Sequence, residues 1–341
     1  MIKDILISDY DYPLPEERIA KYPLEQRDQS KLLVWEDRLS SLSGQAGKPV
    51  LHESTFAHVA DFLPEGSLLV FNNTKVIHAR LFFRKPTGST IEIFCLEPWN
   101  QPVATAFEER QHCTWTCFVG NNKKWKSEPL SRTFHIDSNE VTLTATRREA
   151  VTNTWIIDFD WTGGYSFAEV IEYAGVIPLP PYLNREAEES DSERYQTVYA
   201  RHEGSVAAPT AGLHFTDAVF ESLKTKGIDT EFITLHVGAG TFKPVSTETI
   251  GEHEMHVEQV QVAAENLERI LAQQGKPVIA VGTTTVRTLE SVYWFGVKLS
   301  QTPTLEAMHV LQWDPYELAP ISLEESYRNV LRWMEAHGLS T

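Results

Sequence analysis

The sequence has only three cysteines among its 341 residues, Cys95, Cys113 and Cys117. An odd and low cysteine count excludes a disulfide scaffold and is typical of proteins from a reducing compartment. Long apolar runs are also missing, since none approaches the roughly 20 residues that a membrane-spanning helix requires. The first residues, MIKDILISDYDYPLPEE, turn acidic and proline-rich at once, so a signal peptide is not expected. We therefore expect a cytoplasmic protein.

Positive charge is scarce as well, because 30 Lys and Arg residues stand against 47 Asp and Glu residues, for a formal net charge of −17. This balance argues against a histone-like binder of nucleic acids and against attachment to an anionic membrane surface. It leaves room for one local basic surface. Between residues 75 and 150, eleven basic residues outnumber eight acidic residues, so the excess of negative charge lies elsewhere in the chain.

The pattern of apolar residues predicts an α/β fold with an all-β insertion. Between residues 67 and 160, short runs of β-branched and aromatic residues alternate with turn residues, as in antiparallel barrels or sandwiches. From residue 161 onward helical and strand patterns alternate, which indicates a layered α/β domain. We therefore expect a discontinuous α/β domain (residues 1–66 and 161–341) interrupted by an inserted antiparallel β-barrel domain (residues 67–160).

Two segments rich in small residues have the pattern of ligand-binding loops. GSVAAPTAGLHFT (Gly204–Thr216) leads into a capped helix, whose start favours an anionic ligand. Thr210 and His214 add polar groups there, which favours a site over the alternative of a tight buried loop. In TLHVGAGTFKPV (Thr234–Val245), a strand ends in Gly-Ala-Gly, but the third glycine of a dinucleotide fingerprint and the preceding acid are absent.

A third segment, VGTTTVRTLES (Val281–Ser291), runs from an apolar strand into a helix that starts with three threonines. Their hydroxyls can cap the helix or bind a ligand at the end of the strand. Arg287 lies about one helical turn in, within reach of a carboxylate or phosphate. The alternative is a simple cap with a surface pair between Arg287 and Glu290.

Two further motifs indicate less about function. HEMH (His253–His256) is not the zincin motif, and the cysteines lie elsewhere, so we expect no metal site. The turn at Lys123–Lys126 combines three lysines with Trp125, which suits phosphate and base contacts. A solvated hairpin tip explains that turn about as well.

Together these blocks resemble one family, the S-adenosylmethionine:tRNA ribosyltransferase-isomerases of queuosine biosynthesis. The resemblance runs from Asp11 to Tyr293 and is carried by seven blocks: Asp11–Val34, Leu68–Leu81, Ile177–Arg185, Arg194–Thr216, Thr234–Val245, His253–Glu258 and Val281–Ser291. Family members usually continue with a Pro-Gly-Tyr-x-Phe stretch, an Asn-Phe-His-x-Pro block and a terminal helix. Neither motif occurs in Gly296–Thr341, so we expect a shortened chain or a divergent relative.

The resemblance implies transfer and isomerisation of the ribosyl group of S-adenosylmethionine. The acceptor is the 7-aminomethyl-7-deazaguanine wobble base of a tRNA with a GUN anticodon, and the products are epoxyqueuosine, adenine and methionine. This chemistry needs a base near the acidic 5′ carbon, a proton donor for adenine and a neutral acceptor amine. Groups that titrate near neutrality suit these tasks, so His214 and His236 are our candidate catalytic residues. We expect no metal and a monomeric protein.

Further site residues follow from the same resemblance. We expect Arg287 to hold the methionine carboxylate. The nucleoside pocket is expected to be lined by Thr210, Gly212, Gly238, Gly240, Thr283 and Thr284. We expect the tRNA to contact Asn72, Lys75, Arg80, Lys123, Lys124 and Lys126.

Two other functions stay open at this point. One is an S-adenosylmethionine-dependent RNA methyltransferase, which the Gly-Ala-Gly after a strand suggests. The absent acid before Gly238 and the β insertion count against it. The other is a non-catalytic RNA-binding relative.

Overall fold

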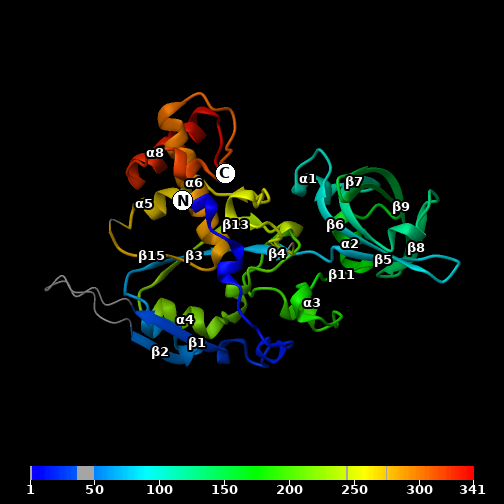
Figure 1. Cartoon of the computed structure of the whole chain (residues 1–341), viewed down its shortest axis with the longest axis horizontal. Coiled ribbons are helices and arrows are strands. Elements are labelled where there is room, and N and C mark those ends of the chain that lie inside the picture. Colours follow the sequence, from blue (N-terminus) through cyan, green and yellow to red (C-terminus); the bar gives the residue numbers. More distant parts are fainter. Residues whose placement is uncertain (1, 37–49, 243–244, 274) are drawn as a thin grey trace.

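The computed structural model describes residues 2–36, 50–242, 245–273 and 275–341. The chain forms two units that lie side by side along the longest axis of the molecule (Figure 1). The α/β unit contains both described ends of the chain, and residues 80–176 form the β unit. The parallel strands β4 (Thr74–Val76) and β12 (His202–Ser205) lie where the two units meet.

A sheet of four strands, counted over the described residues, forms the centre of the α/β unit, and we call it the β3 sheet. Its strand β3 (Leu68–Asn72) pairs in parallel with β13 (Asp229–His236) on one side and with β15 (Val278–Ala280) on the other. Strand β14 (Gln259–Gln261) is antiparallel to β13 and forms an edge. All residues of β3 are buried, as an uninterrupted apolar run predicts for a central parallel strand.

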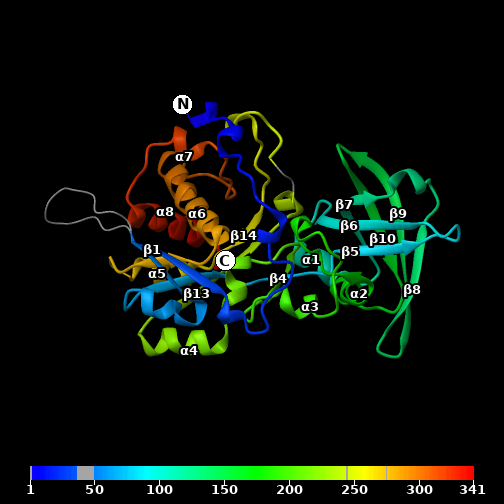
Figure 2. The ribbon, with the colours of Figure 1, turned by 60° about the horizontal axis from the view of Figure 1, so that its bottom comes forward.

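Helices cover both faces of the β3 sheet (Figure 2). On one face, Leu68 and Val70 pack in a common core with α5 (Ala264–Leu271), α6 (Thr283–Gln301) and α8 (Leu323–Ala336). On the other face, Leu69 and Phe71 pack with α4 (Asp217–Thr225) and the 3₁₀ helix η5 (Phe56–Phe62). Because successive side chains of a strand point to opposite faces, β3 supplies both cores. These layers confirm the predicted α/β class.

The β unit contains one curled antiparallel sheet of seven strands among the described residues. In spatial order they are β11 (Gly175–Val176), β5 (Arg80–Arg84), β6 (Thr90–Pro98), β7 (His112–Gly120), β10 (Thr154–Trp161), β9 (Asn139–Val151) and β8 (Leu130–Ile136). The described strands leave β11 and β8 as separate edges, so the sheet is open where a closed barrel was expected. Helix α2 (Phe167–Ala174) packs against β5, β8 and β11 and contributes to the core of this sheet.

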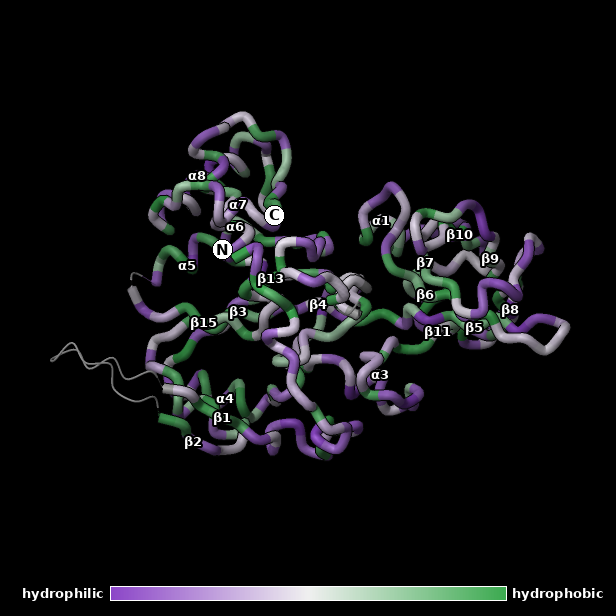
Figure 3. Tube along the Cα trace, viewed as in Figure 1, coloured by the Kyte–Doolittle hydropathy of each residue, from purple (hydrophilic) through white to green (hydrophobic). Residues whose placement is uncertain are grey.

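The remaining described elements lie around these two sheets. They are the antiparallel strands β1 (Lys31–Glu36) and β2 (Val50–Thr55) and the short helices α1 (Val103–Glu108), α3 (Asp191–Arg194) and α7 (Asp314–Glu317). Hydrophobic stretches run through the interior of both units, while the outer loops are mostly hydrophilic (Figure 3). Among the described helices, none combines the length and the apolar character that crossing a bilayer demands.

The contact between α6 and α8 depends on Gly296. A Cβ atom at this position would lie 2.2 Å from the carbonyl oxygen of Ser326, so the two helices approach more closely than a side chain allows. Ser326 is fully buried, and its hydroxyl donates to the carbonyl oxygen of Tyr293 at 2.6 Å. Asn329 donates to the carbonyl oxygen of Gly296 at 3.1 Å. The close approach thus places polar groups of α8 directly on the backbone of α6.

We expect Gly296→Ala to lower the free energy of unfolding by about 1–3 kcal/mol, because the added methyl group would push α8 away from α6. Helix propensity alone would stabilise the variant by up to about 1 kcal/mol. The sign of the change in unfolding free energy therefore shows which of the two effects is larger. Glu290→Ala, at an exposed position of α6, is the control and should change stability by less than about 0.5 kcal/mol. Equal urea denaturation curves for Gly296→Ala and the wild type would contradict the packing argument.

Candidate functional site

Asn72 ends β3, and its side-chain amide holds the neighbouring strand. The Nδ2 group donates to the carbonyl oxygen of Leu235 at 2.9 Å, and the N–H of Leu235 donates to Oδ1 at 3.0 Å. The amide therefore acts as one more peptide group beyond the end of β3. Nδ2 also lies 3.4 Å from the hydroxyl of Thr284 on α6. Asn72 is fully buried, so it braces the site and does not reach the surface where a tRNA contact was expected.

A cavity of about 680 Å³ lies at this edge of the β3 sheet, and we call it the threonine cavity. Its walls combine small apolar side chains with hydroxyl groups. The hydroxyls belong to Thr210, Thr241, Thr283 and Thr284, and the small residues include Ala207, Ala208, Ala211, Val237 and Gly282. Three of the segments singled out in the sequence, Gly204–Thr216, Thr234–Val245 and Val281–Ser291, therefore contribute residues to one cavity.

Helix α6 begins at the threonine cavity. Gly282 precedes its first residue and has a φ of +86°, a conformation that favours glycine. The first N–H groups of a helix have no acceptor within the helix, and its N-terminus carries a partial positive charge. Thr283 and Thr284 add hydroxyls to the same end of the cavity. This end therefore favours an anionic or electron-rich group of a ligand.

An ion pair holds the outer wall of the threonine cavity. The guanidinium of Arg185 donates to both carboxylate oxygens of Asp191, at 2.6 and 2.7 Å. Hydrogen bonding to Arg185 lowers the pKa of the nearly buried Asp191 carboxyl, so the pair stays charged at neutral pH. Arg185 also lies over the ring of Tyr22, 4.5 Å from its centroid. The pair fixes the segment between Tyr182 and Tyr195, which both line the cavity.

Neither candidate catalytic histidine lines the threonine cavity. His214 ends the 3₁₀ helix η8 (Thr210–His214), and its ring packs against Phe56 with 5.3 Å between centroids. Burial lowers the pKa of His214, and a hydrogen bond to the backbone of Arg27 offsets this only in part. His236 lines a second cavity, whereas the next residue, Val237, lines the threonine cavity. The alternation of side chains at the end of β13 thus places His236 apart from the threonines.

The glycines that were expected in the nucleoside pocket do not line it. A Cβ atom at Gly212 would lie 1.9 Å from the hydroxyl of Tyr199, so this glycine allows close packing against Tyr199. Gly240 lies against the ring of His256, where a Cβ atom would be 2.3 Å from Cγ. Gly238 follows Val237 and donates its N–H to Glu258 at 3.3 Å. Of the expected pocket residues, the structure brings Thr210, Thr283 and Thr284 together.

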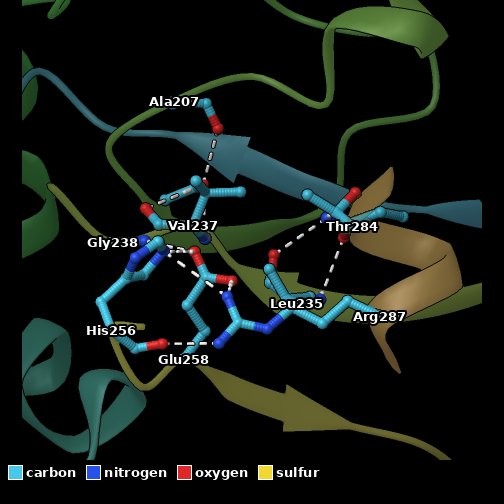
Figure 4. Close-up of polar contacts among 10 residues, drawn as sticks. Ala207, Leu235, Val237, Gly238, His256, Glu258, Thr284 and Arg287 are labelled. Atoms are coloured by element: carbon cyan, nitrogen blue, oxygen red, sulfur yellow. Dashed lines mark hydrogen bonds and ion pairs between the residues drawn. The ribbon is translucent and has the colours of Figure 1, made fainter. Parts of the chain in front are cut away.

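Arg287 binds a carboxylate of the protein itself, Glu258, with 2.6 Å between Nη1 and Oε2 (Figure 4). It also donates to the carbonyl oxygen of His256 at 2.5 Å. The Glu258 side chain is only 4% exposed, accepts the N–H of Gly238, and lies 3.1 Å from Nε2 of His256. This cluster connects α6 to the loop that follows β13, next to the threonine cavity.

Glu258, in the block HEMHVE (His253–Glu258), was not predicted from the sequence as a site residue. The available signal was spacing, because residues two apart, such as His256 and Glu258, lie on the same side of an extended segment. Across the described residues, no group of three or more His, Cys, Asp or Glu side chains could hold a metal ion.

The cations expected at the junction are paired with carboxylates. Nζ of Lys75 lies 2.8 Å from Oε1 of Glu203, and Nε of Arg80 lies 2.5 Å from Oε1 of Glu92. Burial acts to lower the pKa of Lys75, but the hydrogen bond and charge of Glu203 outweigh it, and the pKa is raised. Both side chains are therefore charged but already neutralised by a partner.

The turn at Lys123–Lys126 presents exposed cations but no exposed aromatic ring. Lys123, Lys124 and Lys126 are exposed. Trp125 is buried and donates its indole N–H to the carbonyl oxygen of Glu128 at 2.9 Å. The expected base contact through this ring is therefore wrong, because a buried ring has no face open to a nucleobase.

The chain belongs to the queuosine biosynthesis protein family, whose sequence pattern matches residues 7–310. It is 41% identical over 288 residues to the S-adenosylmethionine:tRNA ribosyltransferase-isomerase of Pelobacter propionicus, covering 84% of this chain and 77% of that protein. The protein of the same name from Francisella tularensis subsp. novicida is 41% identical over 285 residues, covering 83% of this chain and 76% of that protein. A crystal structure of S-adenosylmethionine tRNA ribosyltransferase from Thermotoga maritima is 25% identical, with a TM-score of 0.36 and coverage of 97% of this chain and 93% of that chain. Family membership confirms the resemblance carried by the sequence blocks.

His236 makes the stability of the protein depend on pH. Burial, with the charge of His202 as a smaller cause, lowers its pKa to about 4, so protonation favours the unfolded chain. The stability contributed by the neutral ring is complete above about pH 6.5, the unfolded value, and is lost as the pH falls toward 4. Between pH 7 and pH 4 we expect the wild type to lose about 3 kcal/mol more unfolding free energy than His236→Gln.

Urea denaturation at a series of pH values measures this difference. His135→Gln, at an exposed position of β8, is the matched control and should keep the pH dependence of the wild type. Parallel stability profiles for the wild type and His236→Gln would show that His236 does not titrate with folding.

Proposed function

We propose that this chain is an S-adenosylmethionine:tRNA ribosyltransferase-isomerase. It transfers and isomerises the ribosyl group of S-adenosylmethionine onto the 7-aminomethyl-7-deazaguanine wobble base of a tRNA with a GUN anticodon. The products are epoxyqueuosine in the tRNA, adenine and methionine. The observation that carries the proposal is the 41% identity, over 84% of this chain, to a relative of that name. Because its substrate is tRNA, the protein acts in the cytoplasm, and we propose that it does so as a monomer.

The threonine cavity supports this proposal as the site for S-adenosylmethionine. Its volume of about 680 Å³ lies in the range of small-molecule sites. The small residues at Ala207, Ala208 and Gly282 allow a nucleoside to approach the backbone closely. We assign the methionine carboxylate to the N-terminus of α6 with Thr283 and Thr284, since Glu258 already neutralises Arg287.

Proton transfer in this reaction requires a titratable group near the cavity. His256, like His214 and His236, does not line the cavity. We propose His256 because Glu258 lies 3.1 Å from its Nε2 atom and the pair adjoins Gly238 and Gly240, which follow Val237 of the cavity wall. Gly240, which lies against the His256 ring, and Gly238, which bonds to Glu258, connect this pair to the wall at Val237. A histidine hydrogen-bonded to a carboxylate is a common general acid or base in enzymes.

We propose that residues 80–176 are an inserted domain that contributes to tRNA binding. Helix α2 and strand β11 pack with the curled sheet, so they belong with it rather than with the β3 sheet. Lys123, Lys124 and Lys126 are exposed in this domain and suit contacts with phosphates. The net negative charge of the whole chain then favours binding through a small basic surface instead of general attraction.

Product analysis tests the proposed function. Incubation with S-adenosylmethionine and tRNA carrying 7-aminomethyl-7-deazaguanine should release adenine and methionine and leave epoxyqueuosine in the tRNA. A methyltransferase would instead release S-adenosylhomocysteine, and a non-catalytic RNA-binding relative would release no product. Either of these two results would contradict the proposal.

We expect Thr284→Val to raise the KM for S-adenosylmethionine about tenfold, which corresponds to about 1.4 kcal/mol, because valine keeps the shape but lacks the hydroxyl. Thr285→Val is the matched control, since Thr285 is buried and its hydroxyl donates to the carbonyl oxygen of Val281 at 2.8 Å, away from the cavity. Steady-state kinetics with saturating tRNA provide both values. An unchanged KM in Thr284→Val would remove this hydroxyl from substrate binding.

A further inference from the structure

A second cavity, of about 660 Å³, lies between the two units, and we call it the junction cavity. Phe107, Arg110 and Ser166 line it from the β unit, and Arg201, His202 and His236 line it from the α/β unit. The end of β13 separates it from the threonine cavity, because His236 and Val237 point to opposite faces. The junction cavity is therefore a different site from the one proposed for S-adenosylmethionine.

Arg201 is a cation of this cavity that no carboxylate pairs with in the described part of the chain. Its N–H donates to the carbonyl oxygen of Asn73 at 2.8 Å, which fixes the backbone just before β12. In the described part of the chain, no hydrogen bond or ion pair engages its guanidinium. By contrast, Lys75 and Arg80 at the same junction are each paired with a carboxylate.

The other charges around the junction cavity partly balance one another. Arg110 donates to the carbonyl oxygen of Gly164 at 2.9 Å. Hydrogen bonds from Ser166, with the charge of Arg110 as a smaller cause, lower the pKa of Glu169. Glu203 is paired with Lys75, and Glu108 is the lining carboxylate without an ion pair among the described residues. Two guanidinium groups thus face one unpaired carboxylate. A planar guanidinium binds a phosphate through two parallel hydrogen bonds, so this balance suits a single phosphate.

We propose that the junction cavity binds one phosphodiester group of the tRNA through Arg201, so that the RNA backbone passes between the two units. This inference rests on the proposed function, which makes tRNA the substrate. The cavity volume is large enough for a nucleotide. Residues of both units would then contact the same RNA strand, which fixes the curled sheet relative to the β3 sheet when the substrate binds.

The test is the salt dependence of binding to an RNA hairpin that carries the anticodon stem and loop. Each lost phosphate contact makes the slope of log K against log salt less negative by roughly 0.7 for single-stranded RNA. We expect Arg201→Ala to show this change and a dissociation constant about tenfold higher, with Arg201→Lys between Arg201→Ala and the wild type. Arg332→Ala, on the exposed side of α8, is the matched control and should keep the wild-type slope.

The outcomes separate this inference from the proposed function. Equal slopes for Arg201→Ala and Arg332→Ala, with normal adenine release by the wild type, would overturn the phosphate site and leave the proposed function intact. Binding of inorganic phosphate to the wild type but not to Arg201→Ala, with unchanged RNA binding, would show a site for a free anion and overturn the RNA assignment. If the wild type bound no RNA at all, both the proposed function and this inference would fail.

Discussion

Strand β3 carries the constraint on which the rest of the structure depends, because it is hydrogen-bonded on both sides and packed on both faces. Its alternating side chains, Leu68 and Val70 on one face and Leu69 and Phe71 on the other, belong to two different cores. Its parallel neighbours β13 and β15 end at the same edge of the sheet. Ligand sites of α/β sheets form at this edge because loops and helix starts converge there. The threonine cavity follows from that geometry.

Much of the fold could be predicted from the sequence because its local signals agree with one another. Ser166 and Thr216 cap helices where the sequence places helix starts, and both caps are made. The open form of the curled sheet could not be predicted in the same way. A helix such as α2 reads as amphipathic wherever it packs, and the sequence does not say which sheet its apolar face covers. That choice depends on contacts between Phe167 and residues far away in the chain.

Residues of the candidate site could be predicted from the sequence where their place along a helix or strand decides where they lie in the fold. Threonines at a helix start after a parallel strand lie at the sheet edge in an α/β fold, and Thr283 and Thr284 do so. The histidines were not predictable, because the cavity that His236 faces depends on how β13 lies between two units. Arg287 binds a carboxylate, as expected, but that carboxylate belongs to Glu258 of a separate loop. Only the structure shows that the charge of Arg287 is already neutralised within the protein.

The hydrogen bonds of the Asn72 side chain affect how such a chain can change over evolutionary time. Its amide continues the hydrogen bonding of β3 after the main chain has turned away, so the sheet is complete without any residue of the β unit. The β unit is thus attached to the sheet edge without forming part of it. Substitutions, insertions and deletions in that unit can accumulate while the geometry of the sheet edge is preserved. The two units are therefore free to evolve at different rates, each under its own selection.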